Sequence, residues 1–134
     1  MATLPTTPAG YTFGAALTWV QKEYGYLINE VESFPSAPST PPTSPFVPNN
    51  GDRLALAVVN IGISNVYIGL SAGVSGGNGI LLVANGGSFT IDVRRDMTLP
   101  SRAWWTVSSG IPNPLYVLEL IGVRALLPGT VPGT

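Results

Sequence analysis

The spacing of apolar residues divides the chain into a front part with helical spacing and a longer back part with strand spacing. In the front part, apolar residues recur in alternating steps of four and three, at Phe13, Leu17, Val20, Tyr24, Leu27, Val31 and Phe34. This spacing predicts an amphipathic helix over 13–33, which begins after the N-cap residue Thr12 and ends before Pro35. Because Gly14 and Gly25 disfavour a helix, a strand over Thr18–Ile28 stays open as the alternative.

From Gly51 onward the apolar period falls to two, and glycine and asparagine separate the apolar runs. The predicted strands are Arg53–Asn60, Asn65–Leu70, Gly79–Val83, Ser88–Val93, Ala103–Ser108 and Leu115–Val123. Short strands at this spacing are typical of a small antiparallel β-sandwich, here expected to be jelly-roll-like. A jelly roll has eight strands, so the front part of the chain would have to supply two more.

Six prolines between 35 and 48 mark the segment between these two parts. Each proline fixes φ and removes a hydrogen-bond donor, so the segment is expected to be an extended spacer. Its PxxP spacings, Pro38–Pro41 and Pro42–Pro45, lack the flanking arginine of a typical SH3 ligand, and the spacer is preferred. The predicted organisation is therefore an N-terminal arm over 1–34, a linker over 35–50 and a β-sandwich domain over 51–134.

Composition limits the chemistry that these elements can perform. Only 10% of the 134 residues are charged, the net charge is −1, and histidine and cysteine are absent. Ser-His and Cys-His nucleophiles, His- or Cys-based zinc sites and disulfides are therefore excluded, and no cofactor or metal is expected. The near-neutral charge argues against nucleic acid or an anionic membrane as a partner. No signal peptide is expected, and the apolar runs are too short for a membrane-spanning helix.

Two of the predicted strands are apolar on both faces. Leu54–Val59 and Leu115–Ile121 do not alternate cleanly, and a domain of this size has too little material to cover both faces itself. Subunit contacts or the N-terminal arm are the expected cover. Together with the scarcity of charge, this favours a subunit of an assembly over an enzyme.

The predicted strands also resemble a known group of proteins. Arg53–Asn60, then Asn65-Val66-Tyr67-Ile68-Gly69-Leu70, then Asn78-Gly79-Ile80-Leu81-Leu82 and Gly87-Ser88-Phe89-Thr90, resemble small β-sandwich proteins of tailed-phage virions; so do Trp105–Gly110 and Leu115–Glu119. The resemblance covers roughly residues 51–121. It implies a non-enzymatic virion structural protein, such as a head decoration or minor capsid protein or a fibre-base module, made in the host cytoplasm and located on the capsid surface. A capsid decoration (cement) or minor capsid protein is expected, with the major capsid protein and further copies of itself, favoured as a homotrimer, as partners.

Apolar residues that could meet a partner occur in the arm, at the end of the proline-rich linker and at the pair Trp104-Trp105. The candidates for subunit or capsid contact are Phe13, Leu17, Trp19, Val20, Tyr24, Leu27, Val31, Phe46, Val47 and Trp104.

Three other roles remain open at this point. One stays structural: the sandwich could itself be a shell-forming jelly roll, which ranks below decoration unless the arm supplies two further strands. The alternative is a carbohydrate- or receptor-binding module of a tail or head fibre, with Trp104, Tyr67 or Tyr116 as a stacking platform. An enzyme would have to be a hydrolase that uses Asp92 and Asp96, but the adjacent Arg94 and Arg95 would keep both carboxylates ionised, and surface ion pairing is preferred.

Overall fold

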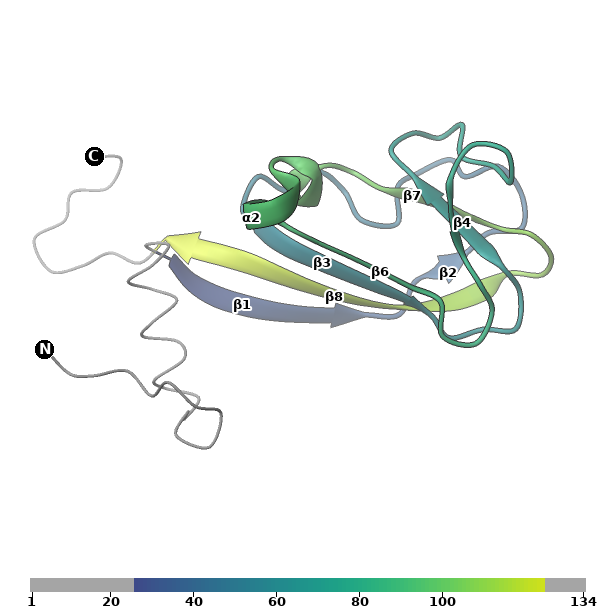
Figure 1. The fold of residues 1–134 in the computed structure, drawn as a ribbon, viewed down its shortest axis with the longest axis horizontal. Coiled ribbons are helices and arrows are strands. Elements are labelled where there is room, and N and C mark those ends of the chain that lie inside the picture. The colour runs from purple at the N-terminus through teal and green to yellow at the C-terminus, as the bar shows by residue number, and fades with distance from the viewer. Residues whose placement is uncertain (1–25, 125–134) are drawn as a thin grey trace, which may run out of the picture. The chain divides into compact units, whose positions relative to one another are not determined.

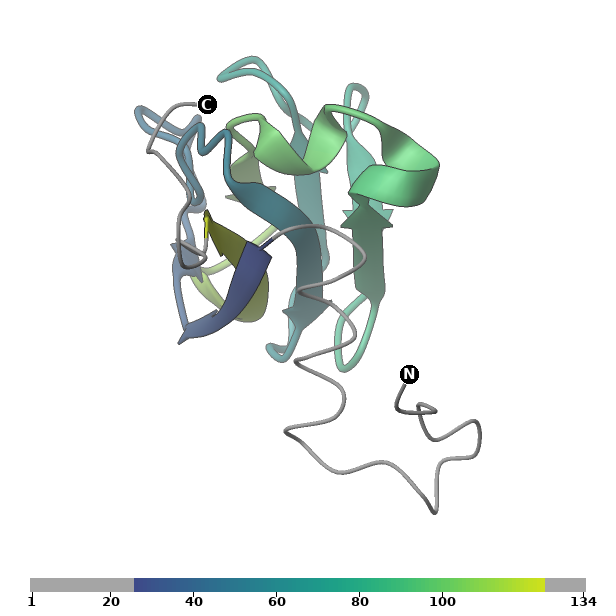
Figure 2. The ribbon, with the colours of Figure 1, turned by 90° about the vertical axis from the view of Figure 1, so that its left-hand side faces the viewer.

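The computed structural model describes residues 26–124, whose fold is mainly β (Figure 1). Within this range there are eight strands: β1 (Tyr26–Ser33), β2 (Ser36–Ala37), β3 (Arg53–Asn60), β4 (Val66–Gly69), β5 (Ile80–Leu82), β6 (Ser88–Asp92), β7 (Trp105–Ser108) and β8 (Asn113–Arg124). Two short helical segments, α2 (Val93–Asp96) and η2 (Leu99–Ser101), follow β6. η2 packs against β3, and α2 lies at the end of β6, next to η2 (Figures 1 and 2).

The strands form two sheets. The larger has the order β1-β8-β3-β6, with β2 also paired to β8, and the smaller has the order β5-β4-β7. Pairing runs inward from the two ends of the described chain: β1 pairs with β8, β3 with β6 and β4 with β5. The remaining strands, β2 and β7, are linked where the Ser108 N–H donates to the carbonyl of Pro38 at 2.7 Å.

One hydrophobic core joins the two sheets. The larger sheet contributes Leu56, Val58 and Val117, and the smaller contributes Val66 and Ile68, all at most 2% exposed. Along β3 the buried positions alternate from Leu56 to Asn60, as expected for a strand with one face on the core.

The sequence predicted all six strands after Gly51, and the structure confirms each of them. Arg53–Asn60 matches β3 residue for residue, and the other five boundaries differ by one or two residues. In β6, Ile91 is buried and Thr90 exposed, as the alternation required. Val93 differs, because the chain turns into α2 there instead of continuing the strand.

The helix predicted over 13–33 is wrong for residues 26–33, which form the edge strand β1. Positions 13–25 lie outside the described residues. The physical reason is pairing: β8 runs for twelve residues and offers an edge along which β1 pairs, and this tertiary pairing overrides local helical spacing.

The prediction of a spacer over 35–50 is also wrong. Ala37, Pro42 and Val47 are buried, and Ser36–Ala37 pair with Pro114 and Asn113. The chain bends at 39–40 and 43–44 and packs along both sheets, because Ser36–Ala37 pair with β8 and Pro38 and Val47 bond to residues of and next to β7. The arm and linker thus supply two strands to the same fold as residues 51–124.

A buried arginine at the start of β3 holds four segments together. Arg53 is 1% exposed, and its Nε donates to Oε2 of Glu119 on β8 at 2.7 Å. Its two terminal nitrogens donate to the carbonyls of Pro48 at 2.8 Å, Pro100 at 3.1 Å and Arg102 at 3.2 Å. The guanidinium therefore ties β3, β8, the end of the proline-rich segment and the η2 turn at one point.

Replacing Arg53 with methionine should strongly destabilise the protein. The variant leaves the Glu119 carboxylate, only 13% exposed, without its cation, and breaking such a pair costs about 3–5 kcal/mol. Urea unfolding measures the loss, with Arg102→Met as the control, because Arg102 is exposed and a surface change of this kind shifts stability by only about 0.5 kcal/mol. An Arg53→Met protein as stable as the control would contradict this role.

Candidate functional site

The loops after β3 and β7 are fastened together by two buried asparagines. The Nδ2 of Asn60 donates to the carbonyls of Ser64 at 2.8 Å and Leu82 at 2.9 Å. The Nδ2 of Asn113 donates to Oδ1 of Asn60 at 2.7 Å, and Oδ1 of Asn113 accepts from the Ser64 N–H at 3.0 Å. Both asparagines are fully buried. Neutral amides thus satisfy the backbone of these loops without any charge.

A glycine and a left-handed turn bring a third loop to the same place. A Cβ on Gly62 would lie 2.0 Å from Oδ1 of Asn113, so only glycine fits there. The Gly62 carbonyl accepts from the Asn85 N–H at 2.9 Å. Asn85 and Gly86 have φ of 59° and 122°, the conformation that asparagine and glycine tolerate best. The loops 61–65, 83–87 and 109–112 are therefore held in fixed positions.

These fixed loops present apolar side chains to solvent. Ile63 is 74% exposed, Ile111 57% and Ile61 48%; these three residues are called the loop-end patch. On β5 and just after it, Ile80, Leu81 and Val83 are 42–52% exposed; these are called the β5 edge residues.

The surface that carries both groups has no charge. No charged residue occurs between Arg53 and Asp92 or between Arg102 and Glu119, so the smaller sheet and its loops are wholly uncharged. A single exposed isoleucine is ordinary, but six large apolar side chains on a surface without charge are typical of an interaction site. In the described chain, the charged residues lie on the larger sheet and around the helical turns: Glu30, Glu32, Asp52, Arg53, Asp92, Arg94, Arg95, Asp96, Arg102, Glu119 and Arg124.

The interface residues predicted from the sequence lie mostly elsewhere. Phe13, Leu17, Trp19, Val20 and Tyr24 are outside the described residues, and Leu27 lies on β1. Val31, also on β1, is 38% exposed, and Phe46 is partly buried against the core.

Val47 and Trp104, by contrast, were wrongly placed in an interface, because both are core residues. Val47 is 1% exposed and Trp104 3%. The Trp104 ring packs on Phe89 with centroids 5.1 Å apart, and its indole N–H donates to the Leu99 carbonyl at 3.2 Å. Neither a partner subunit nor a sugar ring reaches Trp104 in this fold.

The paired carboxylates Asp92 and Asp96 have structural partners. Asp92 caps α2, with Oδ1 accepting from the N–H groups of Arg94 and Arg95 at 3.0 and 3.1 Å. Asp96 pairs with Arg95 at 3.1 Å, which confirms the predicted surface ion pair, and it accepts from the Asp92 N–H at 3.0 Å. These contacts account for both side chains as a cap and an ion pair.

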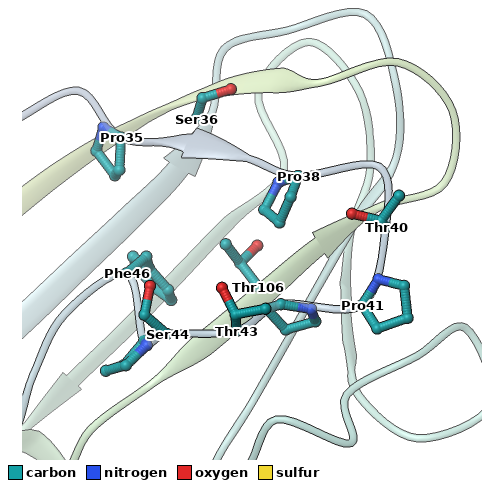
Figure 3. A pocket seen from close by; sticks show the side chains of 11 residues that line it. Pro35, Ser36, Pro38, Thr40, Pro41, Thr43, Ser44, Phe46 and Thr106 are labelled. Carbon is teal, nitrogen blue, oxygen red and sulfur yellow. The ribbon is translucent and has the colours of Figure 1, made fainter.

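The proline-rich segment frames a pocket of about 460 Å³. Its lining is made of proline rings, hydroxyl side chains and Phe46, with Thr106 at its base (Figure 3). No titratable side chain lines it. Within residues 26–124, no group of acidic side chains is arranged to bind a metal, and no helix is long and apolar enough to cross a membrane.

Comparison of the chain with protein-family models, with curated proteins and with solved structures found no match. The uncharged surface is the functional feature whose position the sequence indicates only in part. The signal was present as two long stretches without Asp, Glu, Lys or Arg, at 54–91 and 103–118.

Tyr116, a candidate stacking residue, contacts Glu32 on β1 and Phe34 just after it. Phe34 meets its ring edge-on at 5.6 Å between centroids. The hydrogen bond from its phenol to Glu32 raises the pKa of Tyr116 above 10.0, with partial burial and the negative charges of Glu32 and Glu30 acting in the same direction. The protonated phenol is thus favoured. Its hydrogen bond to Glu32 is therefore present at neutral pH and is lost as the pH rises through the raised pKa.

Replacing Trp104 with alanine should cost about 3–5 kcal/mol of unfolding free energy, because it empties a core site. Trp105→Ala is the matched control and should cost less, because Trp105 is only partly buried. Urea unfolding of the two variants measures the difference. A larger loss in Trp105→Ala would contradict the assignment of Trp104 to the core.

Replacing Glu32 with glutamine should lower the pKa of Tyr116 toward its ordinary value, because the variant removes the charge that favours the neutral phenol. Ultraviolet titration of tyrosinate measures it, with Tyr116→Phe identifying which of the five tyrosines contributes the signal. An unchanged titration in Glu32→Gln would show that this contact does not form in solution.

Proposed function

We propose that the chain is a non-enzymatic structural protein of a tailed-phage virion, made in the host cytoplasm and located on the capsid surface. It self-associates and binds the head as a decoration or minor capsid protein, with the major capsid protein as its partner. Its fold is proposed to be a jelly-roll β-sandwich.

The pairing of the strands supports the jelly roll. A jelly roll arises when one long double hairpin, with the first strand paired to the eighth and the fourth to the fifth, is wrapped into two sheets. Here β1 pairs with β8, β3 with β6 and β4 with β5, and the Ser108–Pro38 bond links β7 to the chain just after β2. The resulting orders, β1-β8-β3-β6 and β7-β4-β5, are those that this wrapping produces. Jelly rolls are common in viral capsid and lectin domains.

The uncharged surface is the observation that carries the function. Docking through the loop-end patch removes isoleucine side chains from water and no charged group, so little desolvation cost opposes the gain of about 25 cal/mol per Å² of apolar area. The loops that carry the patch are already fixed by Asn60 and Asn113, so little conformational entropy is lost on binding. Repetition over a lattice then multiplies a modest contact by avidity.

A second structural role, a shell-forming subunit, is favoured by one observation: the eight strands of the described chain are the number in a jelly roll. Such a subunit assembles into closed shells alone, whereas a decoration protein stays a discrete oligomer until heads are added. The carbohydrate-binding alternative loses two of its three stacking residues, because Trp104 is buried and Tyr116 contacts Phe34 and Glu32; Tyr67, partly buried on β4, is the one that remains.

Replacing Ile63 with lysine should weaken head binding at least tenfold, because it buries a charge in the proposed contact. The control is Met97→Lys, which introduces the same charge at a position with the same exposure, 74%, beside α2. Co-sedimentation with purified heads of the phage that encodes the chain measures binding, and circular dichroism verifies that both variants are folded.

Three outcomes decide between the roles. Loss of binding in Ile63→Lys with binding retained in Met97→Lys supports the decoration role. Shells formed by the wild-type chain alone would support the shell-forming role instead. A wild-type protein that neither binds heads nor is found in virions by mass spectrometry would overturn the virion assignment.

A further inference from the structure

We infer that β5 is a self-association edge: the β5 strands of two copies of this chain pair antiparallel across a twofold axis. The pairing would join two three-stranded sheets into one sheet of six strands. This inference deepens the proposed function and rests on it for the claim of self-association, because it names the surface that carries that step.

The β5 edge lacks the protection that natural sheet edges have. Free edges are normally blunted by charged side chains, prolines, bulges or a covering segment, because their unpaired N–H and C=O groups recruit other strands. β5 has β4 as its only partner strand within the described chain. Its sequence, Ile80-Leu81-Leu82, has no charge or proline, and Ile80 and Leu81 are 42% and 47% exposed.

At the edge strand β6 of the larger sheet, charged side chains hydrogen-bond to the backbone and so protect it from pairing with another strand. Arg95 folds back so that its Nη2 donates to the Thr90 carbonyl at 2.7 Å. Asp96 accepts from the Asp92 N–H at 3.0 Å. Charged side chains therefore occupy backbone groups of β6 that another strand would need.

The remaining edges are covered or charged. Beside β7, the Ser108 N–H donates to Pro38, and Trp104 exchanges backbone hydrogen bonds with Phe46 and Val47. β1 carries Glu30 and Glu32, both exposed. Among the sheet edges of the described chain, β5 is therefore the one that is apolar and has neither charged side chains nor a covering segment; of its backbone groups, the Leu82 carbonyl accepts from the Nδ2 of Asn60.

A second copy of the same edge is the occupant that fits best. Two identical strands related by a twofold axis run antiparallel, so the free N–H and C=O groups of each strand can bond to those of the other. The result is a closed dimer, because the same surface is used on both copies. No charge lies on either side of this contact, because residues 54–91 are uncharged. A three-residue strand is too short alone to supply the roughly 20–30 residues that each side of a stable interface uses, so the loops that flank β5, most of whose residues are exposed, have to contribute the rest.

Cysteine cross-linking tests this pairing cleanly, because the chain has no cysteine. Paired residues on facing antiparallel strands have Cβ atoms about 4.5–5.5 Å apart, near enough for a disulfide to form with a small adjustment. Ile80→Cys and Leu81→Cys are therefore made in the full-length chain and oxidised. The control is Gly51→Cys, an exposed position where an added Cβ meets nothing within 4 Å.

We expect at least one β5 variant to form a covalent dimer in most of the protein, with the control remaining uncross-linked. Leu81→Lys should convert the oligomer to a monomer in light scattering, because the twofold axis brings the two new charges close together, whereas Met97→Lys should not.

Two results would overturn the inference, and they differ in what they say about the proposed function. An oligomeric wild type whose β5 cysteines cross-link no better than Gly51→Cys would place self-association on another surface, as in the expected trimer, and leave the virion role standing. Self-association itself would be overturned by a wild-type protein that stays monomeric at all concentrations and binds heads only as isolated monomers.

Discussion

The buried Arg53 guanidinium is the constraint on which the described fold depends. A charge in a protein interior has to be neutralised and fully hydrogen-bonded, and the partners that do so here come from four different segments. Glu119 supplies the charge, while Pro48, Pro100 and Arg102 supply carbonyls. The segment before β3 and the turn after α2 therefore have to converge on the start of β3, and the core forms beneath them.

At the end of β3 and the start of β8, buried polar groups are hydrogen-bonded by neutral side chains instead of charged ones. There Asn60 and Asn113 satisfy the backbone of the converging loops, and both side chains are fully buried. This division explains the uneven charge of the surface. Among residues 26–124, ionic groups lie on the larger sheet and around the helical turns, whereas the loops at the other end and the smaller sheet are uncharged, so docking there removes few well-hydrated groups from water.

Local pattern was sufficient to predict the strands after Gly51, because one face of each meets the core and the turns between them carry glycine and asparagine. It failed where partners distant in sequence decide the outcome. Leu27, Val31 and Phe34 have helical spacing, yet residues 26–33 form a strand that pairs with β8, about ninety positions further on. The burial of Arg53 depends on Glu119, 66 residues away, and no local signal marks it.

The candidate surface was foreseeable in composition but not in position. The low overall charge and two strands apolar on both faces led to the expectation of an assembly subunit, with the arm and Trp104 chosen as contacts, whereas the two long stretches without charge, which locate the surface, were not used. Trp104 turned out to belong to the core because the residues that enclose it, Phe89, Leu99 and Val47, come from three separate segments. What remains exposed is a set of aliphatic residues on loops and on one short edge strand. Single exposed aliphatic residues in loops are common and do not by themselves indicate an interaction site. This set differs because its loops are held in fixed positions and because the other sheet edges are charged or covered. A surface of this kind is best suited to contact with other uncharged protein surfaces, and a sheet edge in particular is best suited to another strand.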